Sequence, residues 1–393
     1  MNRRNFLHTA ALLPFVANPI AWADLPKGST SRRARRVVLI RLAGGNDGLN
    51  ALVPYRDDFY YRNRPNIAIP ANTLLTLDGR DQGLNPALAS FKELMEEGWA
   101  GLIQNVGYPN ASRSHRRATE IWSTGTDLRP SPETGWLGRW ADASTTPDQI
   151  LGFTLGQAPA RAFASAASRT ELVSSPDTLR NIQITNPKKE QTTVAKLATL
   201  RQIERRIYEY AGLFEQARSG SGHRFDYPDT EFGAAMRWIG DIIETQANTR
   251  IFHTTLGSFE NGFSFDTHLD QLQAHQSLYG EFGQGLSALA KHLQKAGSWQ
   301  DTLVLTYSDF GRLIAENKSG GTEHGDAGLM FIAGGSIAAG VHGQLPDLAG
   351  STNGGINPLV DFRQVFTAVL DRWLDAPAPE IMGGVYSPYP LLA

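Results

Sequence analysis

Short runs of apolar residues, each bounded by glycine, proline or polar residues, recur along the chain and predict buried β-strands. The first, Val37–Ile40, is rich in β-branched residues and is soon followed by Gly44-Gly45. Such runs are typical of parallel strands, which are covered on both faces. Runs of the same kind predict further strands at 101–106, 151–155, 251–256, 303–306 and 329–333.

Between these runs, apolar residues recur at the three- and four-residue spacing of amphipathic helices. At 86–99, for example, Leu88, Phe91 and Leu94 share one face. Helices are likewise predicted at 191–217, 229–247, 269–296 and 358–374. Strands that alternate with helices predict an α/β fold, with a mostly parallel central sheet flanked by helices.

The alternation loosens from about 157 to 190, where Ala, Ser, Thr and Pro dominate. We interpret 157–247 as an irregular and helical insertion in a single domain that spans 36–393. The chain has 393 residues, 41% of them hydrophobic, which is enough for one sizeable core. No internal repeat or long linker divides it.

Composition narrows the possible functions. The formal net charge is −2, so we expect no nucleic-acid partner. The chain has no cysteine, which excludes thiolate metal ligands, cysteine nucleophiles and iron–sulfur clusters. Any metal must therefore be bound by His, Asp, Glu, hydroxyl or backbone oxygen atoms.

Residues 1–23 predict an export signal. Arg3-Arg4 precede Phe6-Leu7, as in twin-arginine signals, and an Ala-x-Ala cleavage pattern ends at Ala23. A membrane anchor or a buried helix is the alternative, but two prolines and an asparagine interrupt the apolar stretch, so we expect no stable membrane span. Residues 24–35 form a basic leader, interpreted as a solvated linker. The expected location is periplasmic or exported, with the twin-arginine export machinery as a partner.

Polar residues cluster where the predicted strands end, the usual place for ligands in open α/β sheets. Asp47 follows the first strand within Gly44-Gly45-Asn46-Asp47-Gly48. The glycines would let the backbone turn sharply and place Asp47 in a crevice. A plain tight turn, which also favours Asp and Asn, is the alternative.

A second cluster, Phe265-Asp266-Thr267-His268, follows the strand at 251–256. In an extended segment, side chains two residues apart share a face, so Asp266 and His268 could bind one cation. Capping of the helix predicted at 269, by Asp266 or Thr267, is the alternative, and both can hold. His275 is a weaker candidate, with a surface histidine as the equal alternative.

The third cluster places Asp309 directly after the buried strand at 303–306 and His324 between glycines in a later loop. Together, Asp47, Asp266, His268, Asp309 and His324 are suited to a divalent ion such as Zn²⁺ or Mn²⁺. Arg312 lies close by in sequence, and could pair with an anionic substrate or with a neighbouring acid.

Ser112-Arg113-Ser114-His115-Arg116 form a fourth cluster at the start of a helical stretch. A hydroxyl at a helix N-terminus lies near free N–H groups and the positive end of the dipole, which suits attack on an anionic ester. A capping serine followed by an exposed basic turn is the alternative.

Together these segments resemble an uncharacterised family of twin-arginine-exported bacterial proteins grouped with the alkaline-phosphatase/sulfatase-like superfamily. The resemblance covers nearly all of the chain after the signal. It rests on the twin-arginine start and on the motifs Arg41–Asn50, Ser112–Gly125, Phe265–His268, Ser308–Arg312 and Gly321–Gly325.

The resemblance implies an α/β sandwich with a two-metal site at the carboxyl edge of the sheet. It makes Asp47 a shared ligand, Asp266 and His268 a pair on one metal, Asp309 a strand-end ligand and His324 the final histidine. It also implies a hydroxyl nucleophile, for which we choose Ser114 over Ser112. His115 or Arg116 would stabilise charge on the transferred group.

This sequence departs from the family and superfamily patterns in three respects. Asp266 and His268 are more closely spaced than the superfamily norm, and Glu323 precedes the final histidine, where the family often has Asp. The third departure leaves the site short of a ligand. Phe310 follows Asp309 where the superfamily usually has a histidine, which leaves one imidazole fewer. The expected function is an exported metal-dependent hydrolase of phosphate or sulfate esters, whether small molecules or surface polymers. The alternative is a non-catalytic periplasmic or surface-associated binding protein that retains the fold.

Overall fold

The computed structural model describes residues 34–144, 150–156, 160–167, 169–174, 209, 211–219, 225–245, 247–260, 262–351 and 353–393. The predicted signal 1–23 lies outside the described residues. So do 24–33 of the basic leader and 191–208 of the helix predicted at 191–217.

The core of the fold is a nine-stranded sheet with the order β13-β5-β12-β9-β1-β8-β6-β7, in which β14 also pairs with β5. Its strands are β1 Arg36–Leu42, β5 Ala100–Gly107, β6 Gly152–Leu155, β7 Thr170–Val173, β8 Ile251–Leu256, β9 Thr302–Ser308, β12 Gly328–Gly334, β13 Gly340–His342 and β14 Val360–Asp361. β1 lies inside the sheet, parallel to both β8 and β9. β12 is antiparallel to its neighbours β5 and β9. The prediction of a mostly parallel central sheet in an α/β fold is therefore confirmed.

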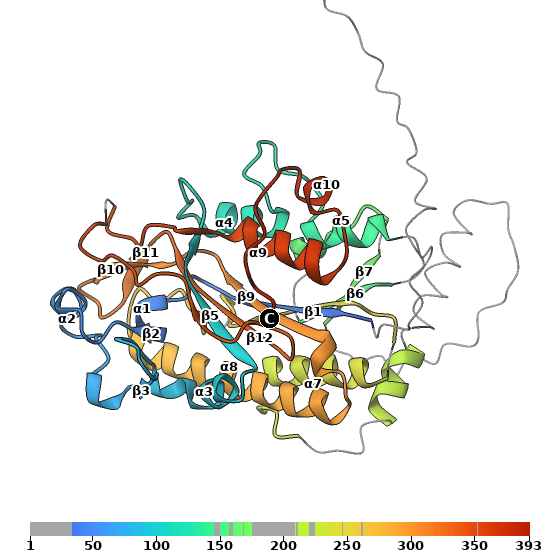
Figure 1. Cartoon of the computed structure of the whole chain (residues 1–393), viewed down its shortest axis with the longest axis horizontal. Helices are drawn as coiled ribbons and strands as arrows, with labels where there is room; N and C mark the ends of the chain where they lie inside the picture. The colour runs from blue at the N-terminus through green and yellow to red at the C-terminus, as the bar shows by residue number, and fades with distance from the viewer. Residues whose placement is uncertain are drawn as a thin grey trace, which may run out of the picture. The chain divides into compact units, whose positions relative to one another are not determined.

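Side chains of β1 alternate between the two faces of the sheet, as the pleat requires. Val38 and Ile40 belong to one apolar cluster, and Val37 and Leu39 to the other. Helices cover both faces (Figure 1). On one face lie α3 Ala89–Glu96, α7 Glu231–Glu244 and α8 Gln271–Lys295; on the other lie α4 His115–Thr124, α5 Trp136–Ala143, α9 Phe362–Ala368 and α10 Ala378–Met382. No helix of the described residues is both long and apolar enough to cross a membrane.

Most predicted elements occur within a few residues of their expected bounds, and two differ for clear reasons. The helix predicted at 358–374 begins at Phe362, because Asp361 forms a capping box with Gln364; it continues as the π-helical turn η7 Val369–Trp373. β7 lies in the stretch predicted to be irregular, where Thr170–Val173 pairs with β6 at the edge of the sheet. That part of the prediction was wrong.

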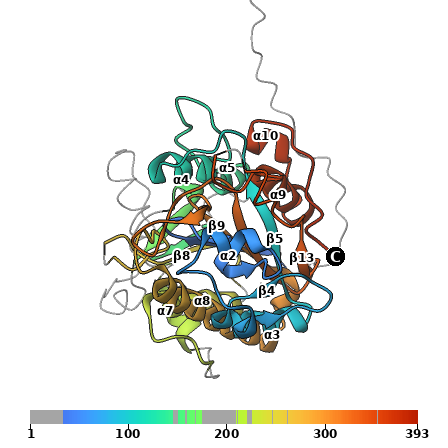
Figure 2. The same cartoon turned by 90° about the vertical axis from the view of Figure 1, so that its left-hand side faces the viewer.

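The parallel strands β1, β5, β8 and β9 all end at one edge of the sheet, the edge that faces the viewer in Figure 2. Short elements surround this edge: α1 Gly48–Ala51, α2 Asp58–Asn63, the strands β2 Leu52–Val53, β3 Leu75–Thr76 and β4 Gly83–Leu84, and the pair β10 Arg312–Glu316 and β11 Thr322–His324. The polar clusters singled out in the sequence all follow these strand ends or lie in β11.

Candidate metal centre

Three histidines and one aspartate from separate segments meet at this edge. Asp266 and His268 follow β8, His115 is the first residue of α4, and His324 ends β11. We call these four residues the histidine–aspartate group. The Nε2 atoms of His268 and His324 each lie 3.1 Å from Asp266 Oδ1, and His115 Nε2 lies 3.2 Å from Asp266 Oδ2. His268 Nε2 and His324 Nε2 are 3.0 Å apart.

Each of the three imidazoles has an acceptor at its other nitrogen. His115 Nδ1 lies 2.8 Å from Asp309 Oδ2, and His268 Nδ1 lies 2.9 Å from Glu323 Oε2. His324 Nδ1 lies 2.8 Å from the carbonyl oxygen of Arg113. Since these oxygens only accept, we assign the proton of each neutral ring to Nδ1. The Nε2 lone pairs then face the Asp266 carboxylate and one another.

Lone pairs that face a carboxylate and one another repel, so this arrangement requires a positive charge between them. His115 Nε2 is buried and makes no hydrogen bond of acceptable geometry, although Asp266 is close enough for an ion pair. A metal-binding histidine typically donates its other N–H to a carboxylate or carbonyl, as all three rings do here. Three imidazole nitrogens and a carboxylate are donors suited to Zn²⁺ or Mn²⁺.

The charges of the group are consistent with that requirement. Burial raises the pKa of Asp266, but the neighbouring His115, His324 and Arg312 outweigh it and hold the pKa far below its usual range. Burial lowers the pKa of His115, but the nearby carboxylates of Asp266 and Asp309 raise it to about 9. Without an ion, a second proton on His115 therefore supplies the missing positive charge.

Asp309 lies behind His115 and is fully buried. Its Oδ1 accepts hydrogen bonds from Arg41 (2.8 Å) and from the Thr119 hydroxyl (3.0 Å), while Oδ2 faces His115. Burial raises the pKa of this carboxyl, but His115 and Arg41 lower it by more, so that the pKa lies below its usual value. Asp309 orients an imidazole of the group, and both of its oxygens have partners already.

Arg312 is buried beneath Asp266. Its guanidinium donates to Asp266 Oδ1 (2.7 Å) and to the carbonyl oxygens of Gly44, Gly45, Phe265 and Thr322. Of the two interpretations of Arg312, pairing with a neighbouring acid is the one observed. A Cβ on Gly44, whose φ is +109°, would lie 2.3 Å from the backbone nitrogen of Asp266. The glycine pair therefore lets the β1 loop approach Asp266 closely.

The structure does not bring Asp47 to this group. Asp47 caps α1 through the N–H of Leu49 and pairs with the buried Arg64 at 2.6 Å. Gln271 donates to the same carboxylate. His275 is buried and bonds to Thr267 at 2.9 Å, so it is not a surface histidine.

Of the predicted catalytic residues, only His115 contacts the other members of the group. Ser114 is the N-cap of α4, is exposed and makes no side-chain capping bond. Arg116 is exposed as well. Within the described part of the chain, no hydrogen bond or ion pair links Ser114 or Arg116 to the histidine–aspartate group. Ser112 Oγ accepts a 3.4 Å bond from the Ser114 backbone.

Two aromatic rings flank the group. The ring centroid of Phe310 lies 4.3 Å from that of His324 and 4.8 Å from that of His115. Phe310, at the position where the superfamily usually has a histidine, therefore forms an apolar wall of the group. Phe259 lies 5.2 Å from His115 and is 46% exposed. The side chains of the group are 22–38% exposed, so small molecules in solution can reach it.

The sequence interpretation missed Arg41, Thr119 and the role of Glu323. Arg41 could have been noticed, because a charged residue near the end of an otherwise apolar buried strand needs a partner. Glu323 was considered only as a departure from the family pattern. Nothing in the sequence distinguished Thr119 from other helical threonines.

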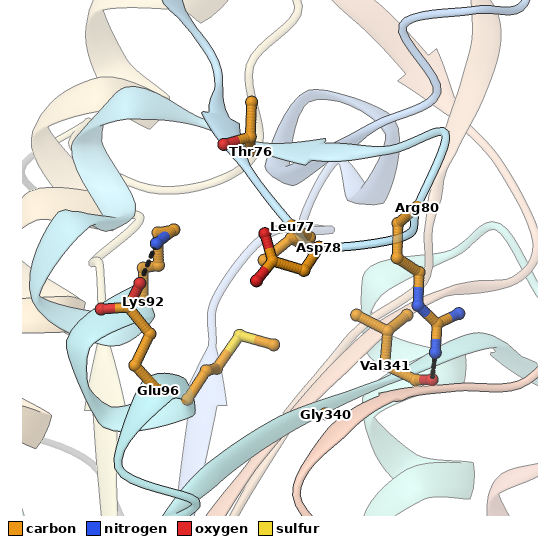
Figure 3. Close-up of a pocket in the computed structure, with 9 residues that line it drawn as sticks. Thr76, Leu77, Asp78, Arg80, Lys92, Glu96, Gly340 and Val341 are labelled. Atoms are coloured by element: carbon orange, nitrogen blue, oxygen red, sulfur yellow. Dashed lines mark hydrogen bonds and ion pairs between the residues drawn. The ribbon is translucent and has the colours of Figure 1, made fainter.

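A cavity of about 300 Å³ lies elsewhere, between β3, α3 and β13 (Figure 3). Of its charged residues, Lys92 pairs with Glu96, and Arg80 donates to the carbonyl oxygen of Val341. It contains no histidine and no residue of the predicted site. We therefore do not assign the chemistry of the protein to this cavity.

Comparison with known proteins places the chain in context. A family model described as "Protein of unknown function (DUF1501)" matches residues 104–373. No curated protein matches the sequence.

Solved structures with some similarity include a protein in the alkaline phosphatase superfamily from Vibrio parahaemolyticus, with 12% identity and a TM-score of 0.38. The match covers 81% of this chain and 64% of that one, so this chain spans less than two thirds of that protein. A sulfatase from Pseudoalteromonas sp. is 11% identical, with a TM-score of 0.36 over 90% of this chain and 68% of that one. The alkaline phosphatase of the Antarctic bacterium TAB5 is 12% identical, with a TM-score of 0.33 over 79% and 95% of the two chains.

Proposed function

This chain belongs to the DUF1501 family, and from its histidine–aspartate group we propose that it is a metal-dependent hydrolase of phosphate or sulfate esters. One observation carries the proposal. Three imidazole Nε2 atoms, each ring held at Nδ1 by an acceptor, converge on one carboxylate at the solvent-accessible edge of the sheet.

His115, His324 and Asp266 would hold a Zn²⁺ or Mn²⁺ ion, and His268, whose Nε2 lies 3.1 Å from Asp266 Oδ1, lies beside them. When bound, such an ion polarises the ester and lowers the pKa of an attacking hydroxyl or water. Asp309, held by Arg41 and Thr119, keeps His115 in the orientation that directs Nε2 to the group. Arg312 holds Asp266 in place from below.

We assign the attack on the phosphorus or sulfur atom of the ester to the Ser114 hydroxyl; the bond to the alcohol breaks, the alcohol leaves with the proton, and water then cleaves the seryl ester and restores the hydroxyl. The Ser114 hydroxyl has no capping bond and lies at the N-terminus of the ten-residue helix α4, next to His115. The positive end of the helix dipole favours an anionic ester there, and the exposed Arg116 offers a counter-charge. Export by the twin-arginine route to the periplasm, and a small or polymeric anionic ester as substrate, belong to the same proposal and rest on the sequence.

Metal content is the first test. The protein is expressed with its native leader, purified without chelators and analysed by mass spectrometry of its metals, beside His324→Ala and Asp266→Asn. We expect Zn or Mn in the wild type and the loss of about one equivalent of metal in both variants. His342→Ala, a histidine outside the group, serves as the matched control and should retain the metal. Metal-free wild-type protein of full stability would contradict the proposal.

Activity is tested next with nitrophenyl phosphate and nitrophenyl sulfate. Ser114→Ala should lower kcat while leaving metal content unchanged. The lack of contact between Ser114 and the group is the observation that favours the second candidate, a non-catalytic binding protein. Bound metal with no turnover of any phosphate or sulfate ester, in wild type and Ser114→Ala alike, would select that candidate.

A further inference from the structure

A second set of ligand-type side chains lies far from the histidine–aspartate group. Asp241 and Glu244 are one turn apart on α7, and His292 lies opposite them on α8. One ligand atom from each lies within 4.8 Å of the others. His292 is 21 residues beyond Gln271 along α8, so this α7–α8 cluster is about 30 Å along the helix from the first group.

The imidazole of His292 is held in a fixed position. The Tyr227 hydroxyl lies 3.0 Å from Nδ1, and the Phe225 ring stacks on the imidazole with 4.4 Å between centroids. A Cβ on Gly240 would lie 2.4 Å from Nδ1, so the glycine allows α7 and the imidazole to approach. On the other side of the ring, Nε2 lies 3.0 Å from Glu244 Oε2 and 4.0 Å from Asp241 Oδ1.

The burial of the Asp241 carboxylate is not explained by hydrogen bonds within the fold. Its side chain is 7% exposed, and no donor among the described residues makes a hydrogen bond to it. A buried carboxylate without a hydrogen-bond donor is costly, and a second carboxylate one turn away adds repulsion. A bound cation would remove both costs.

We propose that Asp241, Glu244 and His292 form a second divalent-cation site, independent of the proposed esterase centre. Two carboxylates and one imidazole suit Mn²⁺ or Zn²⁺ better than Mg²⁺ or Ca²⁺, which prefer oxygen ligands. The side chain of Glu244 is 26% exposed and gives the ion a route from solvent. An ion here joins α7 to α8 on one face of the sheet and acts as a structural clamp.

The test uses the full chain carrying His324→Ala, which disables the first centre. This protein is stripped with a chelator, loaded with Mn²⁺ or Zn²⁺ in turn, desalted and analysed for bound metal. We expect one equivalent, reduced at least tenfold by adding Asp241→Asn or Glu244→Gln. Glu281→Gln, a half-buried carboxylate elsewhere on α8, is the matched control and should keep the equivalent.

A second readout guards against misfolding. Loading with Mn²⁺ or Zn²⁺ should raise the Tm of the His324→Ala protein and of the Glu281→Gln control, but not that of the Asp241→Asn protein. Equal metal content with and without Asp241→Asn would overturn the proposal, and would mean that protons alone neutralise the cluster. Failure of the first centre would instead appear as unchanged metal content and activity on His324→Ala in an otherwise wild-type chain.

Discussion

Three imidazoles of one centre depend on three different acceptors, and these acceptors differ in how firmly they are held. Asp309 is buried, with both oxygens bonded, whereas the side chain of Glu323 is 54% exposed. The carbonyl of Arg113 belongs to the backbone. A buried, fully bonded carboxylate fixes the orientation of its histidine more strictly than an exposed one, so the contribution of each acceptor to metal binding should differ.

Asp309→Asn tests this difference. The side-chain oxygen of the introduced asparagine can accept the hydrogen bond from His115 only if the NH₂ group of the same amide points toward Arg41. The NH₂ group and the Arg41 guanidinium, both hydrogen-bond donors, then face each other. We expect metal affinity to fall about 10- to 100-fold, the usual range for partners of metal ligands. Glu323→Gln, the exposed counterpart, should lower it less. Competition with a chelator of known affinity measures both, and equal effects would contradict the argument.

His253 makes stability depend on pH. Burial, and then the charge of Arg41, lower its pKa from 6.5 to about 3. Because the unfolded chain binds the proton first, stability that is present above pH 6.5 is lost as the pH falls toward 3. The loss is about 2 kcal/mol between pH 6.5 and 5, at roughly 1.4 kcal/mol per unit. Denaturant unfolding of wild type and His253→Gln at both pH values should show a flatter profile in the variant.

A variant of Asp47 distinguishes a structural role of this residue from a metal-binding one. Removing its charge leaves Arg64 buried without a counter-ion, so Asp47→Asn should lower the free energy of unfolding by about 3–5 kcal/mol. The fraction that folds should retain its metal. Denaturation curves and metal analysis of the same sample decide the matter: a stable variant without metal would make Asp47 a ligand, as the family resemblance implies.

At the scale of elements, the buried strands were predictable because their signal is local. Each is an apolar run that needs cover on both faces, and the strand predicted at 251–256 has the observed bounds. The pair β10–β11 had no such signal. Its residues are largely polar, and it is held by a bond from the Arg312 side chain to the Thr322 carbonyl between the two strands and by one from the Asn317 N–H to the Gly321 carbonyl in the turn that joins them. β7 is short and half-exposed, so its pattern resembled that of a loop.

The glycine turn after β1 links an element to the site. Gly44 and Gly79 both have positive φ, but only Gly44 is crowded, whereas nothing lies within 4 Å of a Cβ on Gly79. Gly79→Ala should therefore cost only the backbone strain, about 1 kcal/mol. Gly44→Ala should cost more and also lower metal occupancy, because it displaces Asp266. Matching losses of stability, with metal retained in both variants, would show that the close approach is unimportant.

At the scale of the whole molecule, sequence reasoning anticipated that the candidate residues lie at one edge of the sheet, but not which of them contact one another. Asp266, His268, Asp309 and His324 do gather there. Their exact roles depended on side-chain partners distant in sequence, such as Arg41 for Asp309 and Arg64 for Asp47, and no local pattern encodes those pairs. The single-domain boundaries 36–393 remain a prediction.

Metal removal should affect the stability of the entire fold. The histidine–aspartate group joins segments that follow β5 and β8 to β11, so an ion bound there stabilises the native state by mass action. At a free metal concentration 1,000 times Kd, the gain is about 4 kcal/mol. Calorimetry with and without chelator should show a lower Tm for chelated wild type and a smaller change for His324→Ala. Identical shifts in the two proteins would contradict a metal bound at this group.

The interior position of β1 has a consequence for how the chain reaches its native state. β1 is the first strand of the described residues, yet its partners begin at Ile251 and Thr302, which emerge from the ribosome far later. Non-local pairing of this kind slows folding, because long loops must close before the contacts form. During synthesis, the apolar run Val37–Ile40 therefore remains unpaired and exposed until β8 and β9 have been made. Binding of this segment by a chaperone would then favour productive folding.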